Sequence, residues 1–269
     1  MPATIRQYSQ RAIELKLDEI CFTTHVELDP ARDDGFVYLN GVIHPASQLE
    51  WLDSYFKEIN EAQEEFQNES LIIRTGLEIG YVPGIERKIQ NIIDDYPIDF
   101  VLGAVHTLDN SNISSKSDSP EYFSRKSLSQ MRNEYFTALE NAVDCGLFHC
   151  IAHIDLYRRY GFEYYGAEVF TAHRGVLEPI LEKIASSNMG IEINTSSLRR
   201  NSKEFYPSDE IFKMAVDAGV KIFTVGSDAH CLEHLGLNID DAIGMLDEHG
   251  FKSTIYRKGK PINISDMDF

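Results

Sequence analysis

The sequence has 269 residues, with 43 acidic side chains against 25 Lys and Arg and a formal net charge of −18. A field of that sign repels phosphate backbones and anionic lipid headgroups, so we expect neither nucleic acid nor a membrane surface as a partner. Hydrophobic residues make up 43% of the chain and only 9 residues are proline, a composition that excludes a disordered protein and supports a large core. We expect one globular domain over residues 1–269, within the ordinary size of a single α/β barrel.

Targeting signals are not evident in the sequence. The N-terminal segment is polar and amphipathic, and no stretch approaches the ~20 apolar residues that span a bilayer. The four cysteines show no C-x-x-C spacing, which indicates reduced thiols. We therefore expect a cytoplasmic protein.

Short β-branched or aromatic runs alternate with helical patterns along the chain, an order typical of βαβ units and a parallel sheet. Between the runs, apolar residues at helical spacing, such as Ile85, Ile89 and Ile92, predict amphipathic helices. Two long loops, 29–45 and 109–120, each follow a predicted strand, so they gather at one end of the sheet. That end carries the site in α/β barrels. The predicted strands are Glu19–Thr24, Leu71–Ile79, Phe100–His106, Cys150–Ile154, Gly190–Asn194 and Lys221–Gly226.

Residue types that bind metals stand at five of the six predicted strand ends. Imidazole and carboxylate groups are ligands of Zn, Mn and Fe, and parallel strands bring their ends together. A single histidine at a strand end is more often a hydrogen-bonded structural group, but the joint pattern favours a metal site. The residues are His25, Glu78, His106, His153 and, after the sixth strand, Asp228 and His230.

The remaining histidines fit this pattern less well, and His44, in the first long loop, is the best candidate among them. Asp155 lies two residues after His153. It could orient an imidazole or lie at the surface, and the sequence leaves both open.

Arginine pairs follow two of the predicted strands: Arg158 and Arg159 the fourth, Arg199 and Arg200 the fifth. The planar guanidinium suits phosphate oxygens, so the pairs suggest an anionic group on the substrate, although surface salt bridges remain an alternative. Alternation predicts that Arg159 and Arg199 face the site while Arg158 and Arg200 turn away.

Six segments together resemble the PHP (polymerase and histidinol phosphatase) superfamily, and within it the histidinol-phosphate phosphatase branch. The resemblance implies an α/β fold, a distorted TIM-like (β/α)7 barrel, and up to three divalent metal ions (Zn, Mn or Fe). It also implies hydrolysis of a small phosphate monoester, L-histidinol phosphate, in histidine biosynthesis. The segments occur in chain order and are FTTH, GLEIGY, GAVH, IAHIDLYRRYG, IEINTSSLRR and VGSDAH.

The resemblance also implies residue roles. Glu78 bridges two metals, and His106 with His153 completes the ligands of one of them. Asp228 serves the metal that shares Glu78, while His25 and His230 bind a third. Glu78, His153 and Asp228 form the catalytic group, and Arg159 and Arg199 bind the substrate phosphate. The sequence does not indicate an oligomeric state.

One departure from the family is large. Its members open with a strand carrying H-x-H and a further histidine, and this chain has none of them before residues 5–15. We therefore expect a barrel lacking its first strand, with an open seam between its first and last strands. We also expect one or two metals rather than three, bound most tightly at Glu78, His106 and His153.

Two explanations of the departure remain open. The chain start is a truncated reading, or the chain is a divergent member with little or no hydrolase activity. A phosphoesterase of the same superfamily with another substrate is a further alternative.

Overall fold

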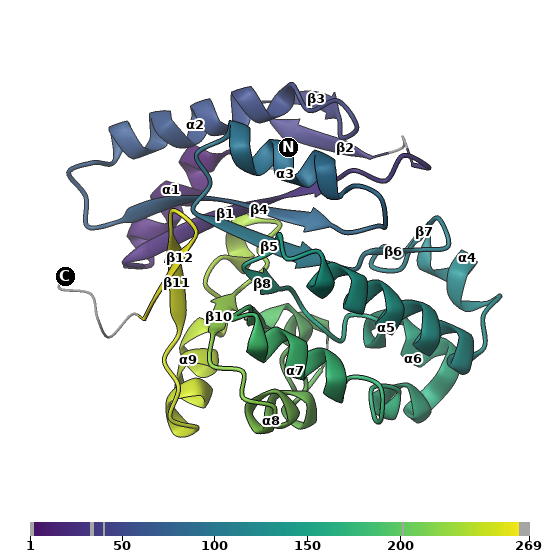
Figure 1. Cartoon of the computed structure of the whole chain (residues 1–269). Coiled ribbons are helices and arrows are strands. Elements are labelled where there is room, and N and C mark those ends of the chain that lie inside the picture. Colours follow the sequence, from purple (N-terminus) through teal and green to yellow (C-terminus); the bar gives the residue numbers. More distant parts are fainter. Residues whose placement is uncertain (1–2, 33–34, 40, 201, 264–269) are drawn as a thin grey trace.

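The computed structural model describes residues 3–32, 35–39, 41–200 and 202–263. In this part of the chain, six parallel strands form one curled sheet, a half-barrel whose outer side is covered by helices (Figure 1). The α/β, TIM-like architecture expected from the sequence is confirmed. In sheet order, the strands are β1 (Glu19–Glu27), β4 (Ile72–Gly80), β5 (Phe100–Ala104), β8 (Cys150–Ile151), β9 (Gly190–Asn194) and β10 (Phe223–Gly226).

Two of the helices begin at capping boxes that the sequence provides. Thr4 and Gln7 form a capping box at the start of the first helix, and Ser127 and Gln130 form another at the fifth. No helix within the described ranges is long and apolar enough to cross a membrane. The α-helices are α1 (Ile5–Glu14), α2 (Trp51–Glu65), α3 (Glu86–Asp95), α4 (Ser119–Phe123), α5 (Leu128–Asp144), α6 (Arg158–Tyr165), α7 (Glu178–Ser186), α8 (Asp209–Asp217) and α9 (Ile239–Glu248), and the 3₁₀ helices are η1 (Gly166–Thr171), η2 (Thr195–Arg200) and η3 (Leu232–His234).

Several predicted boundaries are wrong. The predicted strand Cys150–Ile154 contains only the two residues of β8, because His153 has a φ of 24° that no strand residue adopts. The strand predicted to end at His106 stops at Ala104. The first predicted loop contains a hairpin, the second contains one strand of a hairpin that begins at Thr107, and a further hairpin near the C-terminus was not predicted. These hairpins are β2 (Phe36–Leu39) with β3 (Val42–Pro45), β6 (Thr107–Leu108) with β7 (Ser111–Asn112), and β11 (Thr254–Arg257) with β12 (Lys260–Asn263).

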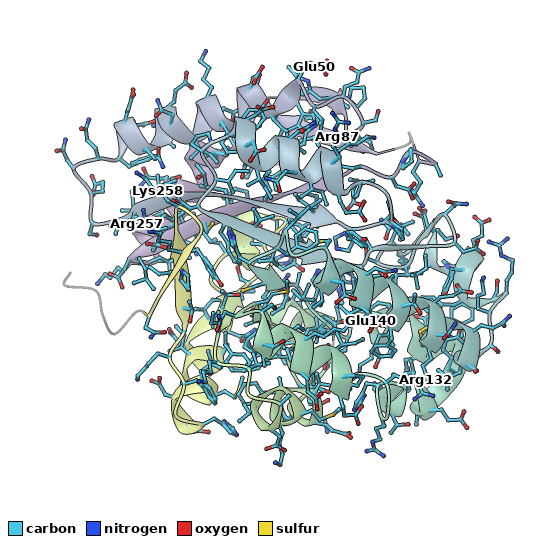
Figure 2. All side chains as sticks on the ribbon, viewed as in Figure 1. Glu50, Arg87, Arg132, Glu140, Arg257 and Lys258 are labelled. Atoms are coloured by element: carbon cyan, nitrogen blue, oxygen red, sulfur yellow. The ribbon has the colours of Figure 1, made fainter. Side chains whose placement is uncertain are left out.

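Alternation along the strands divides the core into an inner and an outer part. Phe100 and Leu102 of β5 point into the barrel, where they pack with Tyr256, while Val101 packs under the helices. The rings of Phe100 and Tyr256 stack with centroids 4.9 Å apart. The turn of the β11–β12 hairpin, where Figure 2 labels Lys258, lies against the amino ends of the strands. This end of the barrel is filled, and the site lies at the other.

The sheet has two edges, β1 and β10. Among the described residues, the pairing on their outer sides is limited to an isolated bridge between Phe223 and Ser253. A cavity of about 410 Å³ lies between them, lined by residues such as Thr23 of β1 and Thr224 of β10. Helix α1 contacts both β1 and η3, so it spans the gap from outside. The open seam expected between the first and last strands is confirmed, and we call this cavity the seam cavity.

Candidate active site

The metal-ligand residue types predicted at the strand ends converge at the carboxyl end of the barrel. The parallel register places His25 of β1 beside Glu78 of β4. His106 and His153 follow β5 and β8, the next two strands of the sheet, and Asp228 follows β10 on the far side of the curl. The curl of the sheet therefore gathers ligands from strands that are distant in the sequence.

Glu78 stands at the centre of these ligands and is 6% exposed. Its Oε1 lies 3.1 Å from His106 Nε2 and 2.9 Å from His153 Nε2. Its Oε2 faces the other way, 3.7 Å from His25 Nδ1. Two ligand atoms of a tetrahedral zinc ion lie about 3.4 Å apart, so these spacings suit a shared cation. Each of the two oxygens would be able to bind a cation together with the imidazoles that it faces.

A second group of ligands lies at the seam. His25 Nε2 is 3.4 Å from His230 Nε2. The ligand atoms of His25, Asp228 and His230 all lie within 4.8 Å of one another, as do those of His25, Glu78 and His106. Asp228 is therefore grouped with His25 and His230 in the structure. The donor set of both groups, imidazole nitrogen and carboxylate oxygen, fits Zn, Mn or Fe.

Carboxylates around the imidazoles set their orientation and charge. Glu27 Oε1 accepts a hydrogen bond from His106 Nδ1 at 2.8 Å, which leaves Nε2 to face Glu78. Burial lowers the pKa of His106, but Glu27 and Glu78 outweigh it and raise the pKa to about 10. Burial raises the pKa of the Glu78 carboxyl, but the surrounding imidazoles outweigh it and hold that pKa well below its usual value. The site therefore favours an ionised Glu78.

The backbone is strained at two of the ligands. His153 has a φ of 24° and Asp228 a φ of 49°, in a region that non-glycine residues rarely occupy. Such conformations cost about 1–3 kcal/mol each and persist where the surroundings hold them. At Asp228 the support comes from Arg199, whose Nη1 and Nη2 donate to the carbonyls of Ser227 and Asp228 at 2.6 and 2.8 Å.

A cavity of about 450 Å³ opens over the ligands, and we call it the arginine cavity. Arg159 lines it, and its Nε is buried with no partner in the part of the chain that the structure describes. Arg158 turns away, as predicted, and binds Asp155 at 2.7 Å. The prediction that Arg200 turns away is wrong. The cavity is lined by His25, His106, Ser114, His153, Leu156, Arg159, Ser196, Arg199, Arg200, Asp228, His230 and His234.

Sequence reasoning missed several residues of this region. Glu27 lies two residues after His25 on β1, so the period of two could have placed it on the same face. Glu192, a charged residue within the apolar strand β9, was a similar signal. Asp155 is fully buried and accepts hydrogen bonds from Arg158 and from the Ser208 N–H, so it holds the start of α8. The other loop candidate, His44, lies on β3 and lines neither the seam cavity nor the arginine cavity.

Comparisons with known proteins identify relatives of the chain. The model of the PHP domain family matches residues 2–196. A probable histidinol-phosphatase of Deinococcus radiodurans is 28% identical over 260 residues, which cover 96% of this chain and 92% of that relative. The histidinol-phosphatase of Lactococcus lactis is 29% identical over 259 residues, which cover 96% of this chain and 90% of that relative.

A solved structure is similar over nearly the whole chain. It is the histidinol phosphate phosphatase of Lactococcus lactis, complexed with Zn, L-histidinol and phosphate. Its fold matches with a TM-score of 0.77 and 25% sequence identity, over 97% of this chain and 94% of that one. The family model alone spans more than half of the sequence, and the resemblance inferred from the six segments is confirmed. The chain belongs to the PHP domain family, in its histidinol-phosphate phosphatase branch.

Proposed function

We propose that this protein is a metal-dependent phosphomonoesterase that hydrolyses L-histidinol phosphate to L-histidinol and phosphate. The observation that carries the proposal is the position of Glu78, whose two oxygens face separate imidazoles beneath the arginine cavity. Ligands for cations and guanidinium groups for phosphate thus meet in one place. The relative whose structure contains Zn, L-histidinol and phosphate supports this substrate.

Two groups of residues would hold divalent ions, one around Glu78 and one at the seam, and His25 lies within reach of both. Such ions, when bound, lower the pKa of water and neutralise charge on phosphoryl oxygens. Glu78, His106 and His153 form the more buried group, and Asp228 with His230 belongs to the group at the seam. We expect one or two ions in this chain, and the ligand chemistry accepts Zn, Mn or Fe.

The arginines act on the substrate phosphate. Arg159 lines the cavity, and its Nε has no hydrogen-bond partner among the described residues, so its guanidinium offers an anion positive charge in a protein whose overall charge repels one. Nη1 and Nη2 of Arg199 donate hydrogen bonds to backbone carbonyls, which fixes its guanidinium at the cavity wall. Its positive charge and its Nε remain for the phosphate. Arg200 adds a third cationic side chain to the same cavity.

The direct test is phosphate release from L-histidinol phosphate by the purified chain loaded with Zn or Mn, beside a chelator-stripped sample. Glycerol phosphate and phosphoserine serve as comparison esters of similar size. We expect metal-dependent hydrolysis with histidinol phosphate preferred. Equal or faster turnover of the other esters would show that the substrate is wrong, and turnover that survives removal of metal would contradict the proposal as a whole.

A second candidate is a PHP barrel with slow or no hydrolysis. The observation that favours it is the exposure of His25 and His230, whose side chains are 41% and 64% exposed beside the open seam. Displacement of a reacting group by about 1 Å can cost on the order of a hundredfold in rate. A chain that binds metal and phosphate but releases no phosphate from any ester would favour this candidate.

A further inference from the structure

Glu192 is a buried carboxylate on the inner face of β9 that the proposed reaction leaves without a role. Its side chain lines the seam cavity, and the residue is 7% exposed. Oε2 accepts hydrogen bonds from the backbone N–H of His153 at 3.2 Å and from Asn194 Nδ2 at 3.0 Å. Neither group of candidate ligands described above includes it. Glu192 therefore contacts the backbone that carries a ligand.

The hydrogen bond to His153 acts where the backbone most needs support. The β8 ladder ends at Ile151, so the N–H of His153 has no strand partner. The φ of 24° at His153 adds strain of about 1–3 kcal/mol. The Glu192 carboxylate takes the place of the strand partner, and in this conformation His153 Nε2 lies 2.9 Å from Glu78 Oε1. Without the carboxylate, nothing described fixes that N–H.

The second hydrogen bond reaches the neighbouring loop. Asn194 donates to Glu192, and its Oδ1 accepts the N–H of Ser196 at 3.0 Å. Ser196 lines the arginine cavity and lies on η2, the helix that carries Arg199. One carboxylate thus connects the loop that carries a candidate metal ligand with the loop that carries a candidate phosphate ligand.

The strand opposite Glu192 leaves room for the carboxylate. A Cβ at Gly226 of β10 would collide with Glu192 Oε1, and the φ of Gly226 is not in the left-handed region. A side chain at this position would therefore have to displace the carboxylate, while the backbone conformation itself admits any residue. This position also supplies a way to displace the carboxylate without altering Glu192 itself.

We propose that Glu192 is a positioning residue, which holds the strained backbone at His153 so that the imidazole faces the ion shared with Glu78. The inference rests on the proposed function, because the role of His153 as a ligand belongs to it. Glu192 acts through hydrogen-bond acceptance, so an uncharged acceptor of the same shape can replace it.

Three variants test this role, with Zn²⁺ affinity measured by chelator competition and the visible absorption spectrum of bound Co²⁺ as readouts. Glu192→Leu keeps the volume but removes the acceptor, and we expect Zn²⁺ to bind about 10–100-fold more weakly, with an altered Co²⁺ spectrum. We expect Glu192→Gln to retain most of the Zn²⁺ affinity and a Co²⁺ spectrum close to that of wild type, because the amide oxygen accepts the same two hydrogen bonds. Gly226→Ala pushes the carboxylate aside and resembles Glu192→Leu. Glu58→Gln, at a buried glutamate of α2, is the matched control and leaves both readouts unchanged.

The outcomes separate this inference from the proposed function. A wild-type chain that binds neither Zn²⁺ nor Co²⁺ contradicts the proposed function itself. A wild-type chain that binds metal, with Glu192→Leu indistinguishable from it, overturns only the positioning role. Glu192→Gln as weak as Glu192→Leu also overturns it, because the charge would then be what matters. Where Glu192→Leu does not fold, Gly226→Ala decides by the same two readouts.

Discussion

The candidate site has two sides that the sheet supports differently. On one, which we call the paired side, His106 and His153 follow strands with a neighbour on each edge, and their side chains are 4% and 5% exposed. On the other, the seam side, His25 and His230 lie at the two edge strands, each paired with another strand on one side only, and their side chains are 41% and 64% exposed. Glu78 contacts both sides.

The difference extends to the groups that hold each ligand. Paired-side ligands have carboxylates behind them, because Glu27 contacts His106 Nδ1 and Glu192 contacts the His153 backbone. On the seam side, His230 Nδ1 has Asp228 as its partner, through the carbonyl at 3.1 Å and the carboxylate at 3.3 Å. The paired-side residues are thus buried and held by carboxylates outside the candidate ligand set, whereas His230 is exposed and its partner, Asp228, is itself a candidate ligand.

The largest expected effect comes from Glu78→Gln, which removes the charge shared by both sides. The amide binds cations weakly, so we expect loss of metal from both groups and a fall in turnover of at least about a thousandfold, from several kcal/mol of lost charge stabilisation. Metal content by mass spectrometry and phosphate release measure the two effects. Retention of one tightly bound ion would show that the two sides bind metal independently.

The second prediction compares the sides directly. His106→Ala removes a buried ligand of the paired side, and we expect it to abolish the tightest Zn²⁺ site. His230→Ala removes an exposed ligand of the seam side and should leave that site intact, with at least about a tenfold difference between the two variants in chelator competition. Equal losses of Zn²⁺ affinity in the two variants would mean that burial and strand pairing do not determine how tightly each side binds the metal.

The third prediction concerns the arginine cavity above both sides. Arg159→Lys keeps the charge but loses the guanidinium, so inorganic phosphate should bind about 1–3 kcal/mol more weakly while metal content stays unchanged. Arg158→Lys is the control, because Arg158 binds Asp155 and Glu204 outside the cavity. Phosphate affinity follows from inhibition of ester hydrolysis. A larger loss in the control would show that Arg158 contacts the anion.

Arg199→Lys should have a compound effect, since Arg199 also holds two carbonyls of the seam-side loop. We expect weaker phosphate binding together with weaker metal binding at Asp228. Unchanged metal affinity would show that the loop keeps its strained conformation without the arginine.

The sequence could predict which histidine and carboxylate side chains converge, because parallel strands place successive carboxyl ends at one edge and position in a strand therefore predicts position in space. It could not predict the direction of Arg200. Alternation holds only within a strand, and Arg199 and Arg200 lie on the 3₁₀ helix η2, where consecutive side chains are about 120° apart and both reach the cavity. The length of β8 depended on the backbone at His153, which is held by Glu192 from another strand.

The smallest expected effect is a change in stability at Glu58, on helix α2, which contacts the edge strand β1 through Tyr55. Glu58 is 9% exposed, and its Oε1 has no partner among the described residues. Burial, with a smaller contribution from Glu61, raises the pKa of Glu58 from 4.5 to about 7. The folded state therefore binds more protons than the unfolded state between these values, so the free energy of unfolding falls as pH rises through that window.

Glu58→Gln removes this fall in the free energy of unfolding. We expect it to raise the free energy of unfolding by about 1–3 kcal/mol at pH 8 and to have little effect near pH 4.5. Urea denaturation of wild type, Glu58→Gln and the exposed control Glu64→Gln at both pH values measures the difference. If wild type and Glu58→Gln show the same dependence of unfolding free energy on pH, Glu58 is not buried as a free carboxyl.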